Sequence, residues 1–204
     1  MSAPTIVLAT TNRGKRAEFG ALFPGVTFLT LDSVGILDLA EPHADFVSNA
    51  VAKATEASRR SGLIALADDS GLLVDALAGA PGVFSARFGG DAASDAANRE
   101  RLLHALDGVP PRRRGARFRC VLALSDVKGP LGESVLTALG SVEGRVCERA
   151  RGVEGFGYDP IFTPLGSKLT LAETSAAEKS AMSHRGVASR SLAPTLRAYL
   201  SARH

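Results

Sequence analysis

The sequence contains no apolar run long enough to cross a membrane and few residues of the kinds that build redox sites. Its apolar runs are of strand length, whereas a transmembrane helix needs about 20 residues. The two cysteines, Cys120 and Cys147, lack C-x-x-C spacing and lie in strand-like segments, so we expect free thiols. Residues 1–4 carry no basic leader before the first apolar segment. We therefore expect a cytoplasmic protein that binds no membrane.

Several signatures of other site classes are also missing. The four histidines have no paired spacing of the kind that zinc sites use, so any metal is expected to be a hard cation. Gly14-Lys15 is followed by Arg16, and Ala9 stands where a Walker A loop has its first glycine. Ser70 lacks the glycine two residues earlier that a nucleophile elbow needs. A P-loop and a serine nucleophile are therefore disfavoured.

Lysine is scarce, and its placement is informative. Of 24 Lys and Arg residues only five are lysine, and Lys15, Lys53 and Lys179 lie in segments that carry other candidate residues. A compact ammonium on a flexible stem suits a polyphosphate ligand. The net charge of +3 fits a phosphorylated ligand but also fits many other proteins.

The pattern of apolar and turn-forming residues predicts an α/β fold. With 204 residues and 45% hydrophobic content, we expect one domain over 1–204, or two lobes that share a sheet. Helices at both ends and a strand-rich centre indicate a mixed central β-sheet flanked by helices. The expected strands are 5–9, 26–31, 63–67, 72–77 and a pair within 117–139, and the expected helices are 16–22, 46–60, 95–106, one opening at Ser175 and 188–202.

An acidic pair, Asp68-Asp69, follows the apolar segment 63–66. Two carboxylates at the end of a strand indicate either a solvated turn or a site for Mg²⁺, which prefers oxygen ligands. Residues 10–15 form a polar connection between a strand and a helix, and the N-terminus of a helix favours an anion. Lys53 is either a phosphate contact or part of a solvated helix face with Glu56.

Three further segments have a functional and a structural interpretation. The segment 155–160 can offer an aromatic ring to a base, or can be a turn with core aromatics; Pro160 argues against a dinucleotide-binding loop. His184-Arg185 is either an exposed polar helix junction or a pair that contacts ligand. The basic run 112–114 has one neighbouring aromatic residue, so a solvated loop is favoured over a nucleic-acid patch.

The ordered set of these segments resembles the inosine triphosphate pyrophosphatase family. The resemblance covers nearly the whole chain and includes residues 10–15, 46–54, 68–71, 79–88, 155–160 and 183–186. Each segment is a weak signal alone, but their order is highly specific. One position departs from the family pattern: Ser48 stands where the family has a glutamate, which removes a carboxylate near the expected metal.

The resemblance implies hydrolysis of inosine, deoxyinosine or xanthosine triphosphate to the monophosphate and pyrophosphate, with Mg²⁺, in a cleft between two lobes of a homodimeric enzyme. It implies that Asp69 binds metal and accepts a proton from water, that Asp68 and Lys53 assist catalysis, and that Glu41 is a metal ligand. The implied substrate-binding residues are Thr10, Thr11, Asn12, Arg13, Gly14, Lys15, Ser70, Phe156, Gly157, Tyr158, Asp159, Lys179, His184 and Arg185.

Two other functions remain open at this stage. One is a pyrophosphatase for modified pyrimidine nucleotides, and the other is a nucleotide-binding module without turnover, for which Ser48 is the sequence hint. Without the resemblance, the chemistry of the residues predicts only a Mg²⁺ site for a phosphorylated ligand. We expect no stable binding of nucleic acid.

Overall fold

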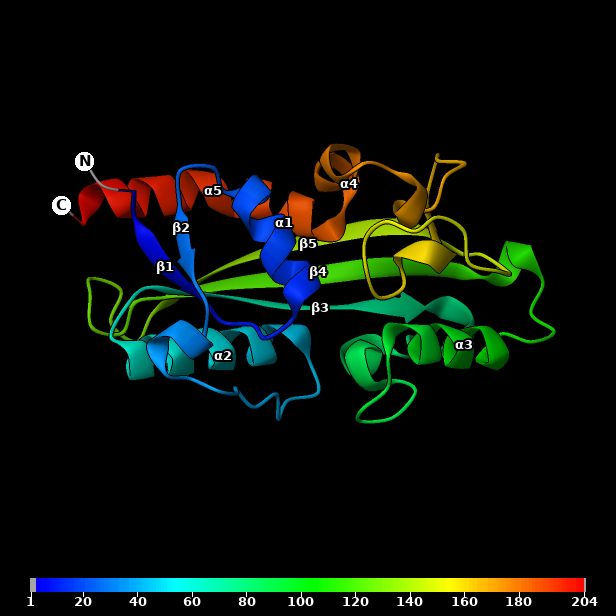
Figure 1. Cartoon of the computed structure of the whole chain (residues 1–204), viewed down its shortest axis with the longest axis horizontal. Helices are drawn as coiled ribbons and strands as arrows, with labels where there is room; N and C mark the ends of the chain where they lie inside the picture. Colours follow the sequence, from blue (N-terminus) through cyan, green and yellow to red (C-terminus); the bar gives the residue numbers. More distant parts are fainter. Residues whose placement is uncertain (1–2, 204) are drawn as a thin grey trace. The chain divides into compact units, whose positions relative to one another are not determined.

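The computed structural model describes residues 3–203 and contains a mixed six-stranded sheet (Figure 1). The hydrogen-bonded order is β2-β1-β3-β4-β5-β6; β1 pairs parallel with β2 and β3, and β5 pairs antiparallel with β6. The strands are β1 Thr5–Leu8, β2 Thr27–Leu29, β3 Ala65–Val74, β4 Gly115–Ser125, β5 Val135–Val146 and β6 Phe162–Pro164. The predicted α/β class with a mixed sheet flanked by helices is confirmed.

The helices begin and end at residues whose side chains or backbone suit those positions. The side chains of Asn12, Asp45 and Ser175 accept hydrogen bonds from backbone N–H groups in the first turns of α1, α2 and α4. Gly62 ends α2 with a φ of 74°, a left-handed conformation that favours glycine. No helix within residues 3–203 has the length and apolar content that a membrane span requires. The helices are α1 Arg13–Leu22, α2 Phe46–Ser61, α3 Asp95–Ala105, α4 Ala176–Met182 and α5 His184–Ala202.

The chain divides into two compact units, which we describe separately. The first comprises the residues up to Asp69, Cys120–Gly140 and the residues from Arg185 onward. The second comprises Ser70–Arg119 and Ser141–His184. The predicted cleft between two lobes stays a prediction, as does the single domain over 1–204.

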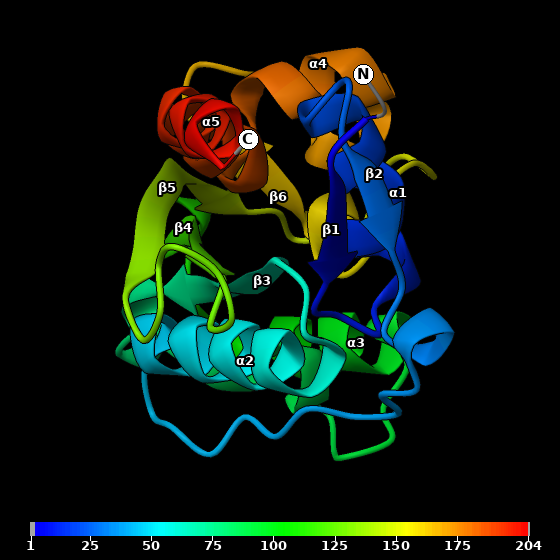
Figure 2. The same cartoon turned by 90° about the vertical axis from the view of Figure 1, so that its left-hand side faces the viewer.

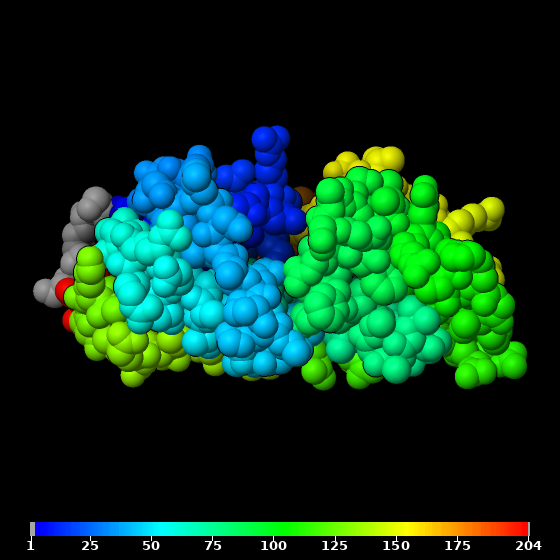
Figure 3. Space-filling model, turned by 90° about the horizontal axis from the view of Figure 1, so that it is seen from below, coloured from blue at the N-terminus to red at the C-terminus, as the bar shows by residue number. Residues whose placement is uncertain are grey.

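The first unit has two apolar cores because residues of its strands alternate between the two faces of the sheet. Ile6, Leu8, Leu66, Cys120 and Leu122 face one core with residues of α1 and α5. The residues between them in sequence face the other core with the alanines of α2, and these are Val7, Ala65, Ala67, Val121 and Ala123. Figure 2 shows α5 and α2 on opposite sides of these strands, and Figure 3 shows the outer side of α2 at the surface in light blue to cyan.

The second unit has a separate apolar core. Leu102 and Leu106, from α3 and its C-terminal end, pack with Leu72 and Val74 of β3 and with Phe118 of β4. Figure 1 shows α3 beside this part of β3. Aromatic and aliphatic residues from the segment Ser141–His184 complete the core, and these are Val146, Tyr158, Ile161, Phe162 and Leu171.

Several predicted boundaries were wrong. Strand β5 runs to Val146, beyond the end of the expected strand pair at 139, and β6 was not expected. A single strand, β3, runs through the acidic pair, whereas two short strands separated by a turn had been expected. Helix α1 begins at Arg13 and not at residue 16, so Arg13, Gly14 and Lys15 belong to its first turn. Helix α5 begins at His184, four residues before the expected start.

Candidate active site

Lys53 lies at the centre of a group of buried polar side chains in the first unit. Its Nζ atom is 2.5 Å from Glu41 Oε1 and 2.9 Å from Asp69 Oδ1, and it donates to the carbonyl oxygen of Asp68 at 3.0 Å. Burial alone would lower the pKa of Lys53, but the charges of Asp69 and Glu41 outweigh burial and raise it. Lys53 is therefore a charged counter-ion for two carboxylates and not part of a solvated helix face with Glu56, which pairs with Arg59.

Asp69 is a carboxylate under two opposing influences. Its residue is 5% exposed, and burial, helped by the negative charge of Glu41, raises its pKa, whereas Lys53 acts in the opposite direction. The net shift is upward. Asn49 Nδ2 contacts Asp69 Oδ2 at 3.4 Å and also donates to the carbonyl oxygen of His43 at 3.0 Å. The amide therefore links Asp69 to the loop before α2.

Asp68, in contrast, has both carboxylate oxygens occupied. Its residue is fully buried; Oδ1 lies 2.5 Å from Lys15 Nζ, and Oδ2 accepts from Arg185 Nε at 2.7 Å and from Cys120 Sγ at 3.2 Å. Burial alone would raise the pKa of Asp68, but Arg185 and Lys15 hold it well below its usual range. Asp68 stays ionised and anchors two cations.

The segment 10–15 caps α1 and presents Lys15 to the acidic pair. Thr10 Oγ1 accepts from the N–H of Asn12 at 3.2 Å, and Asn12 Oδ1 accepts from the N–H of Lys15 at 2.9 Å. Thr11, Asn12 and Arg13 are exposed, and Lys15 Nζ also lies 3.3 Å from the carbonyl oxygen of Asp68. The predicted phosphate-binding segment therefore reaches the buried acids through Lys15.

A second group of candidate residues gathers within the second unit. Asp159 Oδ2 accepts from the N–H of Phe156 at 2.8 Å and pairs with Lys179 Nζ at 2.5 Å. The same Nζ lies 4.6 Å from the centre of the Phe156 ring, within the range of a cation–π contact. Gly157 is held by hydrogen bonds to Asp95 and Arg99. The buried ion pair of Asp159 with Lys179 thus holds the loop 155–160 in place.

Two of the candidate residues in the second unit are more buried than expected. Tyr158 lies in the core, and its hydroxyl donates to the carbonyl oxygen of Ser85 at 2.8 Å, so Phe156, half-buried, is the ring with accessible surface. His184 is 5% exposed and stacks on Phe118 at 4.6 Å. The interpretation of His184-Arg185 as an exposed junction was wrong, since Arg185, in the first unit, is 1% exposed.

Comparison with known proteins identifies the family. The sequence profile of the Ham1 family matches residues 6–195. The chain belongs to the Ham1 family. A protein from Methylococcus capsulatus named dITP/XTP pyrophosphatase is 49% identical over 195 residues, which cover 95% of this chain and 96% of that protein. A protein of the same name from Vibrio vulnificus is 43% identical over 194 residues, with 94% and 96% covered. The resemblance drawn from the motifs is confirmed.

Solved structures of Ham1 proteins share the fold. A HAM1 protein from Coxiella burnetii superimposes with a TM-score of 0.85 at 40% identity, covering 95% of this chain and 98% of that chain. The crystal structure of a nucleoside-triphosphatase, or dITP/XTP pyrophosphatase, from Mycobacterium abscessus gives a TM-score of 0.72 at 42% identity, covering 94% of this chain and 98% of that chain.

Sequence reasoning missed three residues that contact the candidate site residues of this Ham1 chain. Glu18 pairs with Arg185 at 2.5 Å, Cys120 donates to Asp68, and Asn49 contacts Asp69. The spacing of Lys15 and Glu18, three residues apart on a helix, was a usable signal for Glu18. Nothing local in the sequence indicates Cys120, which is 52 residues away from the carboxylate that it contacts.

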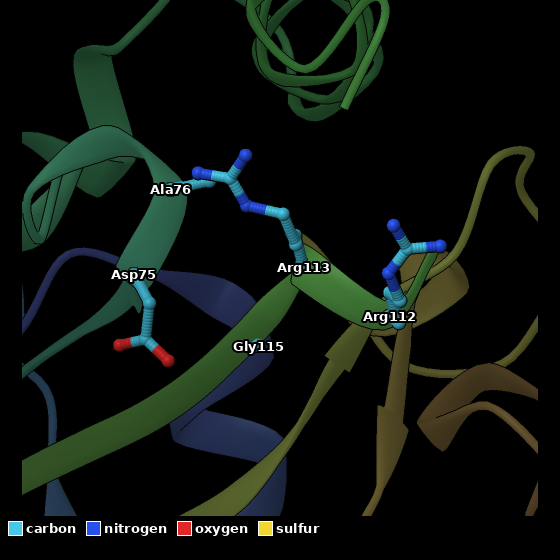
Figure 4. Close-up of a pocket in the computed structure, with 5 residues that line it drawn as sticks. All are labelled: Asp75, Ala76, Arg112, Arg113 and Gly115. Atoms are coloured by element: carbon cyan, nitrogen blue, oxygen red, sulfur yellow. The ribbon is translucent and has the colours of Figure 1, made fainter. Parts of the chain in front are cut away.

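The arginine run of the Ham1 chain is not uniformly solvated. Arg112 and Arg113 are exposed, as expected of a solvated loop, and line a hollow of about 290 Å³ with Asp75, Ala76 and Gly115 (Figure 4). Arg114, in contrast, is buried and donates to the carbonyl oxygens of Leu106 and Val109 at 3.0 and 2.9 Å. Within this run, Arg114 is therefore a buried residue that binds backbone carbonyl groups, whereas Arg112 and Arg113 lie at the surface.

Proposed function

We propose that this chain hydrolyses non-standard purine nucleoside triphosphates, such as inosine, deoxyinosine and xanthosine triphosphate, to the monophosphate and pyrophosphate. The names of its Ham1-family relatives support the reaction and the purine substrate. The observation that carries the proposal for the site is the contact of one buried lysine, Lys53, with both Asp69 and Glu41. Hydrolysis of a phosphoanhydride needs a base and neutralisation of negative charge. Two carboxylates held by one cation are groups of the kinds that can serve these needs.

Asp69 is the proposed base. A carboxylate whose pKa lies above its ordinary value accepts a proton from an attacking water more readily, and burial raises the pKa of Asp69. Lys53 keeps the carboxylate oriented. Asp68 is the proposed support, because its carboxylate is occupied by Lys15, Arg185 and Cys120 and its carbonyl oxygen accepts from Lys53.

The donor set fits Mg²⁺ as cofactor. Within residues 3–203 no three His, Cys, Asp or Glu side chains group so as to hold a metal by themselves. Mg²⁺, however, commonly binds one or two carboxylates together with substrate phosphates and water. Asp69 and Glu41 provide such a pair, since one cation, the ammonium of Lys53, already contacts both carboxylates. When bound there, Mg²⁺ supplies positive charge for the phosphate oxygens.

The remaining candidate residues are proposed to bind the substrate. Lys15 and the residues before it, with Ser70, would contact phosphate, since Lys15 lies at the start of α1, where the helix dipole favours an anion. Phe156 would stack on the base, and His184 and Arg185 would donate to its 6-keto oxygen. The residues assigned with them to substrate binding are Thr10, Thr11, Asn12, Arg13, Gly14, Gly157, Tyr158, Asp159 and Lys179.

A homodimer and a cytoplasmic location are also proposed, on the family resemblance alone. Light scattering of the purified chain tests the first, and a mass of about twice 21.2 kDa is the expected result. Fractionation of cells that express the chain tests the second.

The test of the function is release of pyrophosphate from inosine, xanthosine, adenosine and deoxyuridine triphosphates with Mg²⁺. We expect rapid release from the first two. Asp69→Asn should lower the rate about 10²-fold or more while the circular dichroism spectrum stays unchanged, and Asp91→Asn, at an exposed site, is the matched control. Absence of pyrophosphate with every nucleotide contradicts the function and favours a binding module. A faster rate with the pyrimidine favours the pyrimidine class, and an active Asp69→Asn variant contradicts only the assignment of the base.

A further inference from the structure

Four charged side chains in the first unit form a continuous row that begins and ends on α1. Lys15 Nζ lies 2.5 Å from Asp68 Oδ1, Arg185 Nε donates to Asp68 Oδ2 at 2.7 Å, and Arg185 Nη1 lies 2.5 Å from Glu18 Oε2. Lys15 and Glu18 are three residues apart, on neighbouring positions of the same helix. The row therefore runs from α1 to β3, to α5 and back to α1.

The interior of this row is out of water, and its ends are not fully buried. The side chains of Asp68 and Arg185 are 0% and 1% exposed, whereas those of Lys15 and Glu18 are 14% and 17% exposed. Two cations and two carboxylates alternate along the row. A buried charge is tolerated only when it is paired, so each inner member depends on the neighbours on both of its sides.

Loss of the carboxylate at Glu18 would change how Asp68 shares its two oxygens. A guanidinium forms its strongest contact with a carboxylate when two N–H groups meet two oxygens. With Glu18 in place, Arg185 donates from Nε to Asp68 Oδ2 and from Nη1 to Glu18 Oε2, while Lys15 lies against Asp68 Oδ1. Without Glu18, Arg185 would compete for Oδ1 and weaken the ion pair of Lys15 with that oxygen, and the ammonium would be held mainly by the carbonyl oxygen of Asp68.

We propose that Glu18 is a positioning residue for the reaction: by holding Arg185, it leaves one oxygen of Asp68 to Lys15 and so fixes the ammonium that meets the triphosphate. The inference rests on the proposed function, in which Lys15 binds phosphate. Glu18 itself is given no contact with substrate.

A double-mutant cycle between Glu18→Gln and Lys15→Ala tests the proposal, with inosine triphosphate as substrate. Glu18→Gln alone should raise KM about tenfold and change kcat by less than about twofold. In the Lys15→Ala background the same substitution should leave KM unchanged, because its effect passes through Lys15. Glu18→Asp, which keeps the charge, should restore most of the affinity. Glu56→Gln, at an exposed glutamate paired with Arg59 on α2, is the matched control and should match the parent.

Independent effects of the two substitutions, multiplying in the double variant, would overturn the proposal and leave Glu18 a purely structural residue. If Glu18→Gln does not fold, the cycle is run with Glu18→Asp, whose shorter side chain should give a smaller effect that again vanishes without Lys15. If the parent releases no pyrophosphate, the proposed function fails. The positioning role is then measured separately, as the same cycle in the affinity for a non-hydrolysable inosine triphosphate analogue by calorimetry.

Discussion

Replacement of Lys53 by methionine is the perturbation whose size the structure defines best. Methionine has a similar length but no charge, so Lys53→Met leaves Glu41 and Asp69 close together without their shared cation. At an effective dielectric constant of about 20, each of these contacts represents about 6 kcal/mol of Coulomb attraction. The cost of burying the ammonium offsets much of this sum, and breaking a buried pair typically costs about 3–5 kcal/mol. Because the side chain of Glu41 is 30% exposed, we expect a loss of about 3 kcal/mol at pH 7.5.

This loss should depend on pH, with a sign set by Asp69. Burial and Glu41 already raise the pKa of Asp69 in the folded protein, and removal of Lys53 takes away the main opposing influence. The folded variant then binds a proton more tightly than the unfolded chain, whose Asp pKa is about 3.9. The contribution of Asp69 to the stability of the variant is fully present below that value and is lost as pH rises through the folded pKa. The difference between variant and parent should therefore be smaller at pH 5 than at pH 7.5.

Urea unfolding followed by circular dichroism measures this difference, since the chain has no tryptophan to report by fluorescence. Lys128→Met removes an exposed lysine of the same unit and should change the free energy of unfolding by less than about 0.5 kcal/mol. Equal losses at both pH values, or a loss below about 1 kcal/mol at pH 7.5, would refute the view that Lys53 neutralises the two carboxylates.

Three further predictions concern the ligand and the fold. Lys15→Ala should weaken binding of a triphosphate far more than binding of the nucleoside, and added salt should partly reproduce the effect through screening; equal losses by calorimetry would rule out a phosphate role. Arg185→Ala should reduce the preference for inosine over adenosine triphosphate, because a guanidinium only donates and so rewards a keto oxygen; an unchanged ratio of kcat/KM values argues against base reading. Gly152→Ala should destabilise the chain by about 2 kcal/mol or more in thermal unfolding, since its Cβ would lie 2.2 Å from the carbonyl oxygen of Ala172 at a φ of +80°. Gly166→Ala, with a similar φ and open space, should cost less, and equal costs would show that the contact does not matter.

The parts of the fold that the sequence predicted well are those with local signals. Helix α2 was expected over 46–60 and is observed over Phe46–Ser61, because Gly62 marks its end. The capping box of Ser175 and Glu178 likewise predicted the start of α4. Such signals involve residues close together in the chain, so one segment is enough to read them.

The continuity of β3 through Asp68 and Asp69 could not be read locally. Aspartate is disfavoured inside strands, so an acidic pair after an apolar run indicates a turn. What makes the pair tolerable is a set of cations from distant segments: Arg185 is 117 residues from Asp68, and Lys15 is 53 residues away. The contact of Cys120 with Asp68 could not be predicted for the same reason, because the two residues lie 52 positions apart in the chain.

The hydrogen bond from Cys120 to Asp68 has a practical consequence for following the molecule in solution. Burial, with the negative charge of Asp68, raises the pKa of this thiol well above its usual range, so the nucleophilic thiolate is suppressed while the first unit stays closed. Cys147, in contrast, is only partly buried, and its Sγ lies 3.1 Å from Thr163 Oγ1. Cys120 is therefore expected to react slowly with thiol reagents in the folded chain. Its labelling rate with a small maleimide or disulfide reagent reports how often the strands around the acidic pair separate, with no dye or tag added to the protein.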